Sequence, residues 1–367
     1  MMLIIAYSIL TLALGIYSYA LIDPNITFFQ HPLWVAFRDP LVQFGYYNRE
    51  GSWWAYLILV ILLFILSFFA VKYYKKINII TLSLVIGGIL LFSYPFLSHD
   101  FFNYMFDAKI FTFYHQNPYL QKALDYPGDQ WVRFMHWTHR SYPYGPVFLI
   151  LSFIPAFLGF GKFALSFVLF KLFFISCYFI SVYLLSKLDK KWAIMFATSP
   201  LIIIEGLISS HNDIVAVALG IIGVYFILKK KKMGGIFFLL LSAGIKYITA
   251  PLIVLFNNKF YKIALLFQLL ILTYLSIKME IQPWYFLSLF IFLPIFPKLI
   301  EKLQIFFFGL LISYYPYIRL GGWDTAEKVN LKHQIITTFL IVNLLYFAFL
   351  LFRHWSHLHI EFKKSDT

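Results

Sequence analysis

The sequence predicts an all-α polytopic membrane protein, and three observations lead to this fold class. Hydrophobic residues make up 61% of the 367 residues and charged residues only 13%, which is too little polar surface for a water-soluble chain of this size. Many of the apolar segments are long enough to form membrane-spanning helices. They recur from Met1 to Phe352, so we expect one transmembrane domain over residues 1–367.

The formal charge of +14 does not indicate a nucleic-acid partner, because the lysines lie in short clusters between apolar segments. Such clusters anchor spans at the cytoplasmic leaflet. They comprise Lys72, Lys75 and Lys76; Lys187, Lys190 and Lys191; Lys229 to Lys232; Lys259 and Lys262; Lys298 and Lys302; and Arg353, Lys363 and Lys364. The single cysteine, Cys177, excludes a disulfide bond within the chain.

With every lysine cluster in the cytoplasm, the apolar segments alternate in direction and predict about ten crossings of about 20 residues each. The expected spans are 2–21, 53–71, 78–97, 163–186, 193–208, 213–228, 263–277, 284–297, 303–317 and 334–352. The first has no basic residue before it and no small-residue cleavage site after it, so we expect a retained span. Both termini are expected in the cytoplasm.

Two further apolar segments are too short or too interrupted to cross. Residues 147–158 contain Pro155 and are expected to dip into the membrane and return. Residues 233–258 must begin and end on the same side, which predicts a broken helical hairpin with Lys246 near its tip. Breaks at membrane depth are tolerated where the backbone is buried in protein or lines a wet cavity.

This threading puts the polar clusters 98–119, 139–146, 209–213, 244–248 and 282–285 on the extracytoplasmic side. A site there has no access to cytosolic nucleotides. The outer loop 98–145 opens with Asp100, Tyr104 and Asp107, which share one face of a helix. Carboxylates close to hydrocarbon are costly and usually functional, which favours a functional role for Asp100. For Asp107 a solvating role is equally acceptable.

Two other stretches place candidate site residues on the extracytoplasmic side. In "HRSYPYGPVF" the prolines rigidify the chain and direct Arg140 and Tyr144 to the outer lip, where Arg140 either binds a phosphate or is a plain basic loop residue. In "EIQPWYF" the rings of Trp284 and Tyr285 suit interfacial anchoring and sugar stacking alike.

The stretch "EGLISSHND" places His211, Asn212 and Asp213 in a tight outer turn. Consecutive residues in a turn rarely converge on a metal, and capping of the next helix is a simpler role for Asn212 or Asp213. Glu205, inside the preceding span, should face a polar cavity or a partner. Lys246 needs an anion, which is either a lipid phosphate or one of the carboxylates Glu205 and Asp213.

Other chemistries lack their signatures. The sequence has no Gly-rich phosphate loop, no H-E-x-x-H, no G-x-S-x-G and no cysteine cluster. Nucleotide-sugar, hydride-transfer and zinc mechanisms therefore have no support. Lys171, in the middle of a span, is expected to be a snorkelling or paired structural charge.

Taken in order, the stretches quoted above resemble the multi-span glycosyltransferases of the GT-C class. The series begins with "SHDFFNYMFDAKIFTFYHQNPYL" and includes "GIKY" around Lys246. They are most similar to mannosyltransferase-like members that use polyprenyl-phosphate sugars. The resemblance covers roughly residues 90–300. It implies a GT-C-like bundle with interfacial helices in the outer loop, an outer-loop acid as general base, and a lipid-linked donor that enters from the bilayer.

The class pattern of an aspartate, an aromatic residue one turn later and Asn-Pro-Tyr falls on Asp100, Tyr104 and Asn117 to Tyr119. Relatives commonly have glycine shortly before Asn-Pro-Tyr and before His-Asn-Asp. This chain has His115-Gln116 and Ser209-Ser210 at those places.

These residues combine into one expected reaction, the transfer of a hexose, with mannose first, from polyprenyl phosphate to a hydroxyl of a glycan or glycolipid, with inversion. Asp100 is the expected base, with Asp107 second. Lys246, Arg140 and His211 are expected to bind the donor phosphate. The expected substrate-binding residues are Tyr104, Asn117, Tyr144, Glu205, Asn212, Asp213, Trp284 and Tyr285. No cofactor or metal is expected, because a lipid monophosphate leaves.

Two other functions suit parts of the pattern. Broken helices with charges at membrane depth also occur in transporters and flippases of lipid-linked or anionic solutes, but the polar clusters lie at one face rather than at the midplane. A polymerase or ligase that moves a whole lipid-linked glycan would share the outer site and need a larger acceptor cleft.

Overall fold

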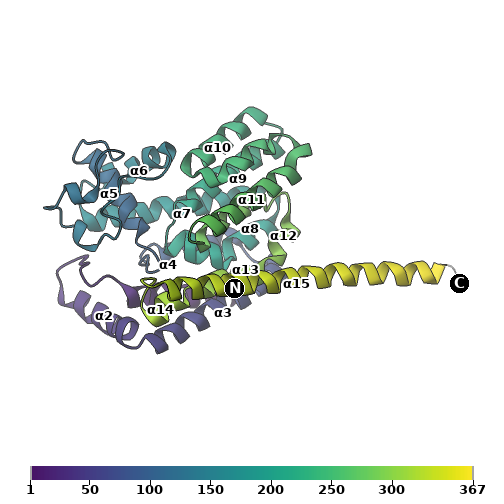
Figure 1. Ribbon diagram of the computed structural model, residues 1–367, viewed down its shortest axis with the longest axis horizontal. Coiled ribbons are helices and arrows are strands. Elements are labelled where there is room, and N and C mark those ends of the chain that lie inside the picture. Colours follow the sequence, from purple (N-terminus) through teal and green to yellow (C-terminus); the bar gives the residue numbers. More distant parts are fainter. Residues whose placement is uncertain (1, 366–367) are drawn as a thin grey trace.

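The computed structural model describes residues 2–365, with side chains described for residues 2–353. The described chain is helical throughout, and its one β-bridge joins Lys122 to Ser141 (Figure 1). The α-helices are α1 (Met2–Tyr17), α2 (Pro32–Val42), α3 (Arg49–Lys72), α4 (Ile79–Leu90), α5 (Asp100–Thr112), α6 (Pro146–Leu158), α7 (Phe163–Leu188), α8 (Lys190–Thr198), α9 (Asp213–Leu228), α10 (Lys232–Ile245), α11 (Tyr261–Lys278), α12 (Pro297–Lys302), α13 (Gln304–Ile312), α14 (Tyr315–Leu320) and α15 (Ala326–Ser365).

Shorter or non-α helical segments join these helices. The 3₁₀ segments are η1 (Ser18–Leu21), η3 (Tyr74–Lys76), η4 (Ala123–Asp125), η5 (Val132–Phe134), η7 (Tyr247–Phe256), η8 (Asn258–Phe260) and η9 (Pro283–Phe292), and the π-helical ones are η2 (Gln43–Tyr47) and η6 (Ile202–Ile208). The buried apolar side chains among the described residues form one continuous core from Tyr7 to Ile336.

Local sequence signals set several helix starts. The side chains of Asn48 and Asn78 accept hydrogen bonds from the backbone N–H groups of Gly51 and Thr81, which caps α3 and α4. Asp189 caps α8 through the N–H of Lys191. Each cap follows a turn between two apolar segments, so these turns separate elements that hydropathy alone would join.

The prediction of an all-α polytopic membrane protein is confirmed, but about ten uninterrupted crossings are not what the structure contains. Among the described residues, five helical segments are long and apolar enough to span a membrane: Met2–Leu21, Arg49–Lys72, Phe163–Leu188, Asn258–Lys278 and Ala326–Arg353. A sixth is the pair α8 and η6, bent by 67°. The remaining predicted spans, 78–97, 213–228, 284–297 and 303–317, contain helices of 12, 16, 10 and 9 residues.

Helix α9 coincides with its predicted span, whereas two other helices stop short at the loop-rich end. Helix α4 ends at Leu90, before Pro95, and α13 ends at Ile312, before Pro316, although their predicted spans run to residues 97 and 317. Hydropathy counts the apolar residues but does not register that the helix stops there. Backbone outside a regular helix is tolerated at such depth because it is buried in protein.

The broken hairpin is present as predicted. Helix α10 and η7 pack against each other and meet at Lys246, whose extended backbone interrupts them. The 13-residue α6, with Pro155 inside it, packs against α5 and α7. These short elements lie around the end of the bundle that carries the outer loop.

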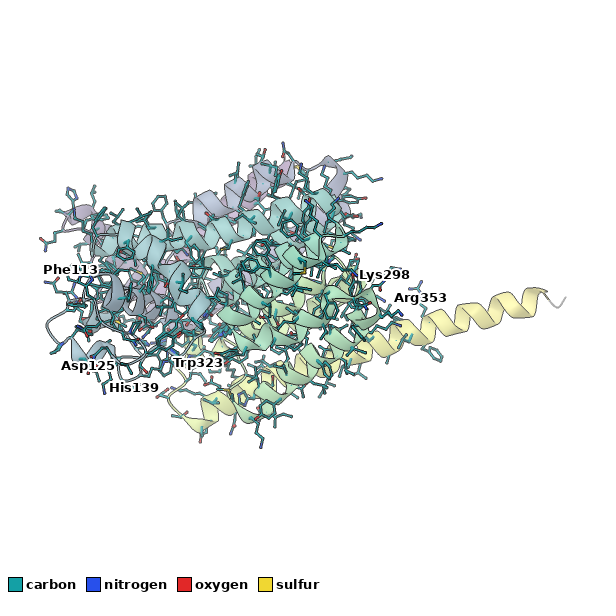
Figure 2. All side chains as sticks on the ribbon, turned by 90° about the horizontal axis from the view of Figure 1, so that it is seen from above. Phe113, Asp125, His139, Lys298, Trp323 and Arg353 are labelled. Atoms are coloured by element: carbon teal, nitrogen blue, oxygen red, sulfur yellow. The ribbon has the colours of Figure 1, made fainter. Side chains whose placement is uncertain are left out.

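The lysine clusters meet at the opposite end. Lys190 Nζ donates to the carbonyl of Lys75 at 2.9 Å, and Lys191 Nζ lies 3.1 Å from Glu301 Oε2. Figure 2 shows Lys298 and Arg353 at that end, while Phe113, Asp125 and His139 of the outer loop lie at the other. The helices therefore separate a lysine-rich end from a loop-rich end, as the threading predicts.

Candidate active site

The loop-rich end contains a cavity of about 490 Å³. Its wall is built from the start of α5, the outer loop, the tip of the α10–η7 hairpin, residues 279–285 and α14. Six residues singled out in the sequence line it: Asp100, Arg140, Tyr144, Lys246, Trp284 and Tyr285. Segments that are up to 185 positions apart, from Asp100 to Tyr285, therefore converge on one space, as predicted.

Asp100 is one of two carboxylates that line this cavity, and the other, Glu280, is paired with Lys332. Asp100 opens α5, and its side chain is 13% exposed. Arg140 Nη2 lies 3.9 Å from Oδ1, and His211 Nδ1 lies 3.8 Å from Oδ2. Burial raises the pKa of Asp100, and the positive charges of Arg140 and Lys246 oppose that rise. Both separations exceed a hydrogen bond, so neither side chain is bound tightly to the carboxylate.

The loop that carries Arg140 is fixed against the hairpin. The N–H of Gly145 donates to the carbonyl of Ile245 at 3.3 Å. A Cβ atom on Gly145 would lie 2.0 Å from the carbonyl oxygen of Gly244, so only glycine permits this approach. The guanidinium of Arg140 lies 4.7 Å from the centre of the Trp137 ring. The close approach places Arg140 and Lys246 on the wall of one cavity.

Lys246 interrupts the hairpin, and its ammonium group reaches the cavity. Its Nζ donates to Asp213 Oδ2 at 2.6 Å and lies 5.1 Å from the centre of the Tyr285 ring. The Lys246 side chain is 18% exposed, whereas Asp213 is 2% exposed. Of the partners expected for Lys246, the structure therefore shows Asp213.

His211 and Glu205 form a buried acid–imidazole pair behind Asp100. Both side chains are fully buried, and His211 Nε2 lies 3.4 Å from Glu205 Oε2. The imidazole stacks on Trp284 with ring centres 3.8 Å apart. Burial lowers the pKa of His211, and the nearby charge of Lys246 lowers it further. Glu205 thus has the partner expected of an acid inside a span.

The turn 209–213 concentrates polar atoms that have no hydrogen-bond partner in the described chain. They include both nitrogens of His211, both carboxyl oxygens of Glu205 and the side-chain amide of Asn212. Buried polar groups are normally satisfied by protein or ordered water. Such a concentration beside a cavity is therefore typical of a wet functional site.

Lys171 supports this turn from behind. Its Nζ donates to the carbonyl of Ile208 at 3.0 Å and to the hydroxyls of Ser93 and Ser210 at 3.0 and 3.1 Å. Ser210 adopts a left-handed backbone with φ of 54°. Lys171 is thus bound by neutral oxygens, and no ion pair among the described residues joins it to a carboxylate.

Seven predicted residues lie outside the cavity lining: Glu205, His211 and Asp213, described above, and Tyr104, Asp107, Asn117 and Asn212. Tyr104 is buried, and its hydroxyl accepts from the N–H of Asn212 at 3.5 Å. Asn212 occupies the N-cap position of α9, but its side chain makes no capping bond. Asp107 is buried on α5, and Asn117 is exposed, with its carbonyl oxygen accepting from the N–H of Tyr119 at 2.9 Å.

Other cavity residues were not predicted: His99, His136, Trp137, Glu280, Gln282, Tyr317 and Trp323. Lys332 donates to Glu280 Oε1 and Gln282 Oε1 at 2.7 Å each and lies 3.9 Å from the centre of the Trp323 ring. Gln282 immediately precedes Pro283-Trp284-Tyr285, a motif that the sequence analysis singled out, so its position in the sequence already indicated a place in the site. Trp323 and Lys332 follow no motif and no helical period that points to the site.

A family model, that of alpha-(1->6)-mannopyranosyltransferase, N-terminal domain, matches residues 33–258. The matched range includes Asp100, Arg140, His211 and Lys246, while the residues after 258, with Trp284 and Tyr285, lie outside it. No curated protein and no solved structure matches the chain. The family match confirms the resemblance noted in the sequence, and the chain therefore belongs to the alpha-(1->6)-mannopyranosyltransferase family, whose members are membrane mannosyltransferases of the GT-C type.

Proposed function

We propose that the protein transfers a mannosyl group from a polyprenyl-phosphate donor to a hydroxyl of a glycan or glycolipid, on the extracytoplasmic face and with inversion. The family supplies the activity and the sugar. The observation that carries the proposal is the shared cavity, whose lining combines the Asp100 carboxylate with two cations, Arg140 and Lys246. A base for the acceptor and positive charge for a leaving phosphate are what this transfer requires.

In the proposed step, Asp100 takes the proton of the acceptor hydroxyl while its oxygen attacks the anomeric carbon. The bond from the anomeric carbon to the phosphate oxygen breaks, and the phosphate leaves with the electron pair. A single displacement gives an alpha product from a beta-linked donor. The family name specifies an alpha-(1->6) linkage, so we propose a 6-hydroxyl as the acceptor group.

Two cations are placed to stabilise the leaving phosphate. Arg140 is 37% exposed and 3.9 Å from Asp100, so its planar fork is free to bind phosphate oxygens. Lys246 is held by Asp213 and exchanges or shares that partner when the phosphate arrives. His211 lies 3.8 Å behind the Asp100 carboxylate. No metal ion takes part in the transfer as proposed.

The aromatic side of the cavity suits the sugar. Trp284 and Tyr285 follow the irregular segment 279–282, and Tyr144 closes the opposite wall. Aromatic faces bury the apolar face of a hexose, while hydroxyls at the ring edge contact polar side chains. Gln282 and Glu280, held by Lys332, supply such polar atoms.

The membrane side follows from the charge distribution. The lysine-rich end contains the clusters around Lys75, Lys190 and Lys298, and positive charge near span ends favours the cytoplasm. The cavity lies at the other end, so the proposal places it outside, with both termini inside. A lipid-linked donor reaches it from the bilayer.

The decisive experiment compares aspartate variants in membranes supplied with polyprenyl-phosphate mannose and a mannose-terminated acceptor. Asp100→Asn should lower turnover by about 10²–10⁴-fold, because it removes the base. Asp107→Asn, on the same helix but outside the cavity, tests the competing base. Asp125→Asn, in an exposed part of the outer loop, is the matched control and should retain activity.

Two outcomes would change the proposal. Normal turnover in Asp100→Asn with loss in Asp107→Asn would move the base to Asp107. Uptake of labelled lipid-linked or anionic solute into proteoliposomes, with no new glycoside formed by the wild type, would support a transporter or flippase instead. A product in which a whole glycan has been moved would indicate a polymerase or ligase.

A further inference from the structure

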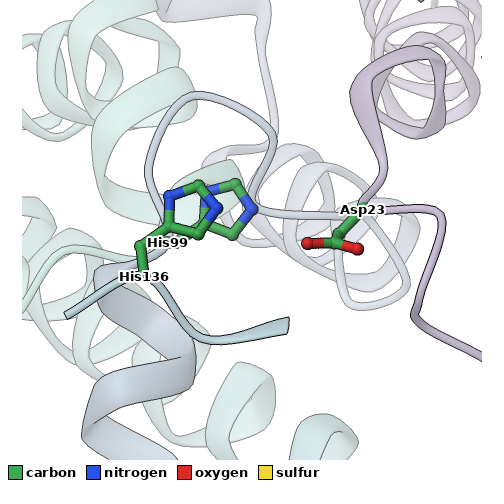
Figure 3. A group of neighbouring side chains, drawn as sticks. All are labelled: Asp23, His99 and His136. Atoms are coloured by element: carbon green, nitrogen blue, oxygen red, sulfur yellow. The ribbon is translucent and has the colours of Figure 1, made fainter. Parts of the chain in front are cut away.

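Three side chains from distant parts of the sequence meet in the wall beside the cavity. Asp23 follows η1, His99 immediately precedes α5, and His136 lies in the outer loop. Each residue offers one ligand atom, and these atoms all lie within 4.8 Å of one another. Figure 3 shows that both imidazole rings turn a nitrogen toward the Asp23 carboxylate. His99 and His136 also line the cavity.

The cluster is not explained by internal hydrogen bonding. His99 is 7% exposed, and its Nε2 has no hydrogen-bond partner in the described chain. The two rings stack with centres 3.5 Å apart and an interplanar angle of 15°. Asp23 Oδ1 accepts from the N–H of Asn25 at 2.8 Å, which fixes the carboxylate and leaves its second oxygen available.

Imidazole nitrogens are common ligands of transition metals, and this cluster supplies two of them. Asp23 adds one negative charge. A pair of imidazoles with one carboxylate is a donor set suited to a divalent transition metal.

We propose that Asp23, His99 and His136 bind a divalent ion of the zinc class, which ties the end of the first span to the outer loop. Ligands at 2.0–2.1 Å in a tetrahedral site lie about 3.3 Å apart. The observed cluster therefore contracts by rotation of the stacked side chains, and water completes the coordination. The ion orders the wall that carries Trp137 and Arg140.

This inference is independent of the proposed transfer. No step of that reaction uses the ion, and zinc binding is measured without donor or acceptor. The two proposals can therefore fail separately. The cluster follows no sequence motif, because the sequence separations from Asp23 to His99 and from His99 to His136 match no helical or loop spacing known for zinc.

The test uses the full-length chain, purified in detergent and stripped with a chelator. Zn²⁺ alone is titrated calorimetrically, and bound zinc per chain is counted by mass spectrometry after gel filtration. His136→Ala and Asp23→Asn should weaken the site by at least about tenfold and lower the bound zinc by one ion per chain. His139→Ala removes an exposed loop histidine outside the cluster and should leave both values unchanged.

The histidines at 354, 357 and 359 are present in every variant, so any zinc bound there contributes equally and cancels in the comparison. Mg²⁺ should not compete, since it prefers oxygen ligands in octahedral geometry. As a second readout, Zn²⁺ should raise the melting temperature of the wild type and of His139→Ala but not of His136→Ala.

A wild type that binds no zinc overturns the proposal without reference to any variant. Equal losses in His136→Ala and His139→Ala also overturn it, because they would indicate adventitious binding by surface histidines. The thermal shift keeps the test valid when a variant is less stable, since each protein is compared with itself with and without Zn²⁺.

Discussion

Two lysines bind side chains of the turn 209–213, Lys171 at Ser210 and Lys246 at Asp213, and their surroundings differ. Lys171 is fully buried among neutral oxygens from Ser93, Ile208 and Ser210. Lys246 is 18% exposed, faces the cavity and has one carboxylate partner, Asp213. We call these surroundings the support region and the cavity region.

The difference separates structure from function. A buried ammonium whose donors all meet internal acceptors stabilises the backbone that supplies those acceptors. In the support region, these include the last carbonyls of η6, which would otherwise be unpaired. In the cavity region, a cation with a single partner and an open side can accept a second anion. Position within a membrane does not by itself indicate a catalytic lysine.

The largest effect is expected from Lys171→Met, which leaves Ile208, Ser93 and Ser210 without their shared donor. Loss of several buried acceptor partners should lower the free energy of unfolding by roughly 3–5 kcal/mol. Melting in detergent measures this. A melting temperature equal to that of the wild type would show that water replaces the ammonium. The distinction between the support region and the cavity region would then fail.

For Lys246 we expect the opposite result, a large loss of activity with little change in stability. Because Lys246→Met alone would leave Asp213 buried and unpaired, the double variant Lys246→Met/Asp213→Asn is used. Its kcat/KM for polyprenyl-phosphate mannose should fall by about 10²–10³-fold, the effect of removing one preorganised charge. The melting temperature should change little. Comparable activity in Asp213→Asn and the double variant would remove Lys246 from the donor site.

Glu205 lies between the two regions and tests how far they are coupled. It is fully buried and 3.4 Å from His211, which in turn lies 3.8 Å from Asp100. We treat it as a positioning residue. Glu205→Gln should lower kcat about tenfold with KM nearly unchanged, because the orientation of His211 is disturbed while the donor contacts remain. A change in KM alone would place Glu205 in substrate binding instead.

The convergence of Asp100, Arg140, Lys246 and Trp284 was predictable, because lysine clusters fix the direction of each span and therefore the side on which each polar stretch emerges. The number of full crossings was not predictable, because hydropathy does not register where a helix ends. Asn117 shows another limit: the sequence motif is present, but its side chain stabilises its own turn.

His136 and Trp323 escaped the sequence analysis for a different reason. Both lie in irregular segments, where no 3.6-residue period predicts which side a residue faces. Their positions are fixed by contacts with other parts of the chain, such as the stack of His136 on His99 and the contact of Trp323 with Lys332. Information of this kind is tertiary and is not contained in local spacing.

The smallest effects concern His115 and Ser210, which both have φ of 54°. A left-handed backbone costs a side-chain-bearing residue about 1–2 kcal/mol, while glycine costs about 0.5–1 kcal/mol in backbone entropy. His115→Gly, in an exposed turn, should therefore raise stability by about 0.5–1 kcal/mol.

Ser210→Gly gains the same relief but removes the hydroxyl that accepts from Lys171 at 3.1 Å. The lost bond is worth about 1 kcal/mol, so the melting temperature should stay unchanged or fall. Comparing His115→Gly with Ser210→Gly isolates the contribution of the support region, because the backbone change is the same at both sites. If both variants stabilise equally, the bond from Lys171 to Ser210 contributes nothing and the remaining acceptors hold the lysine alone.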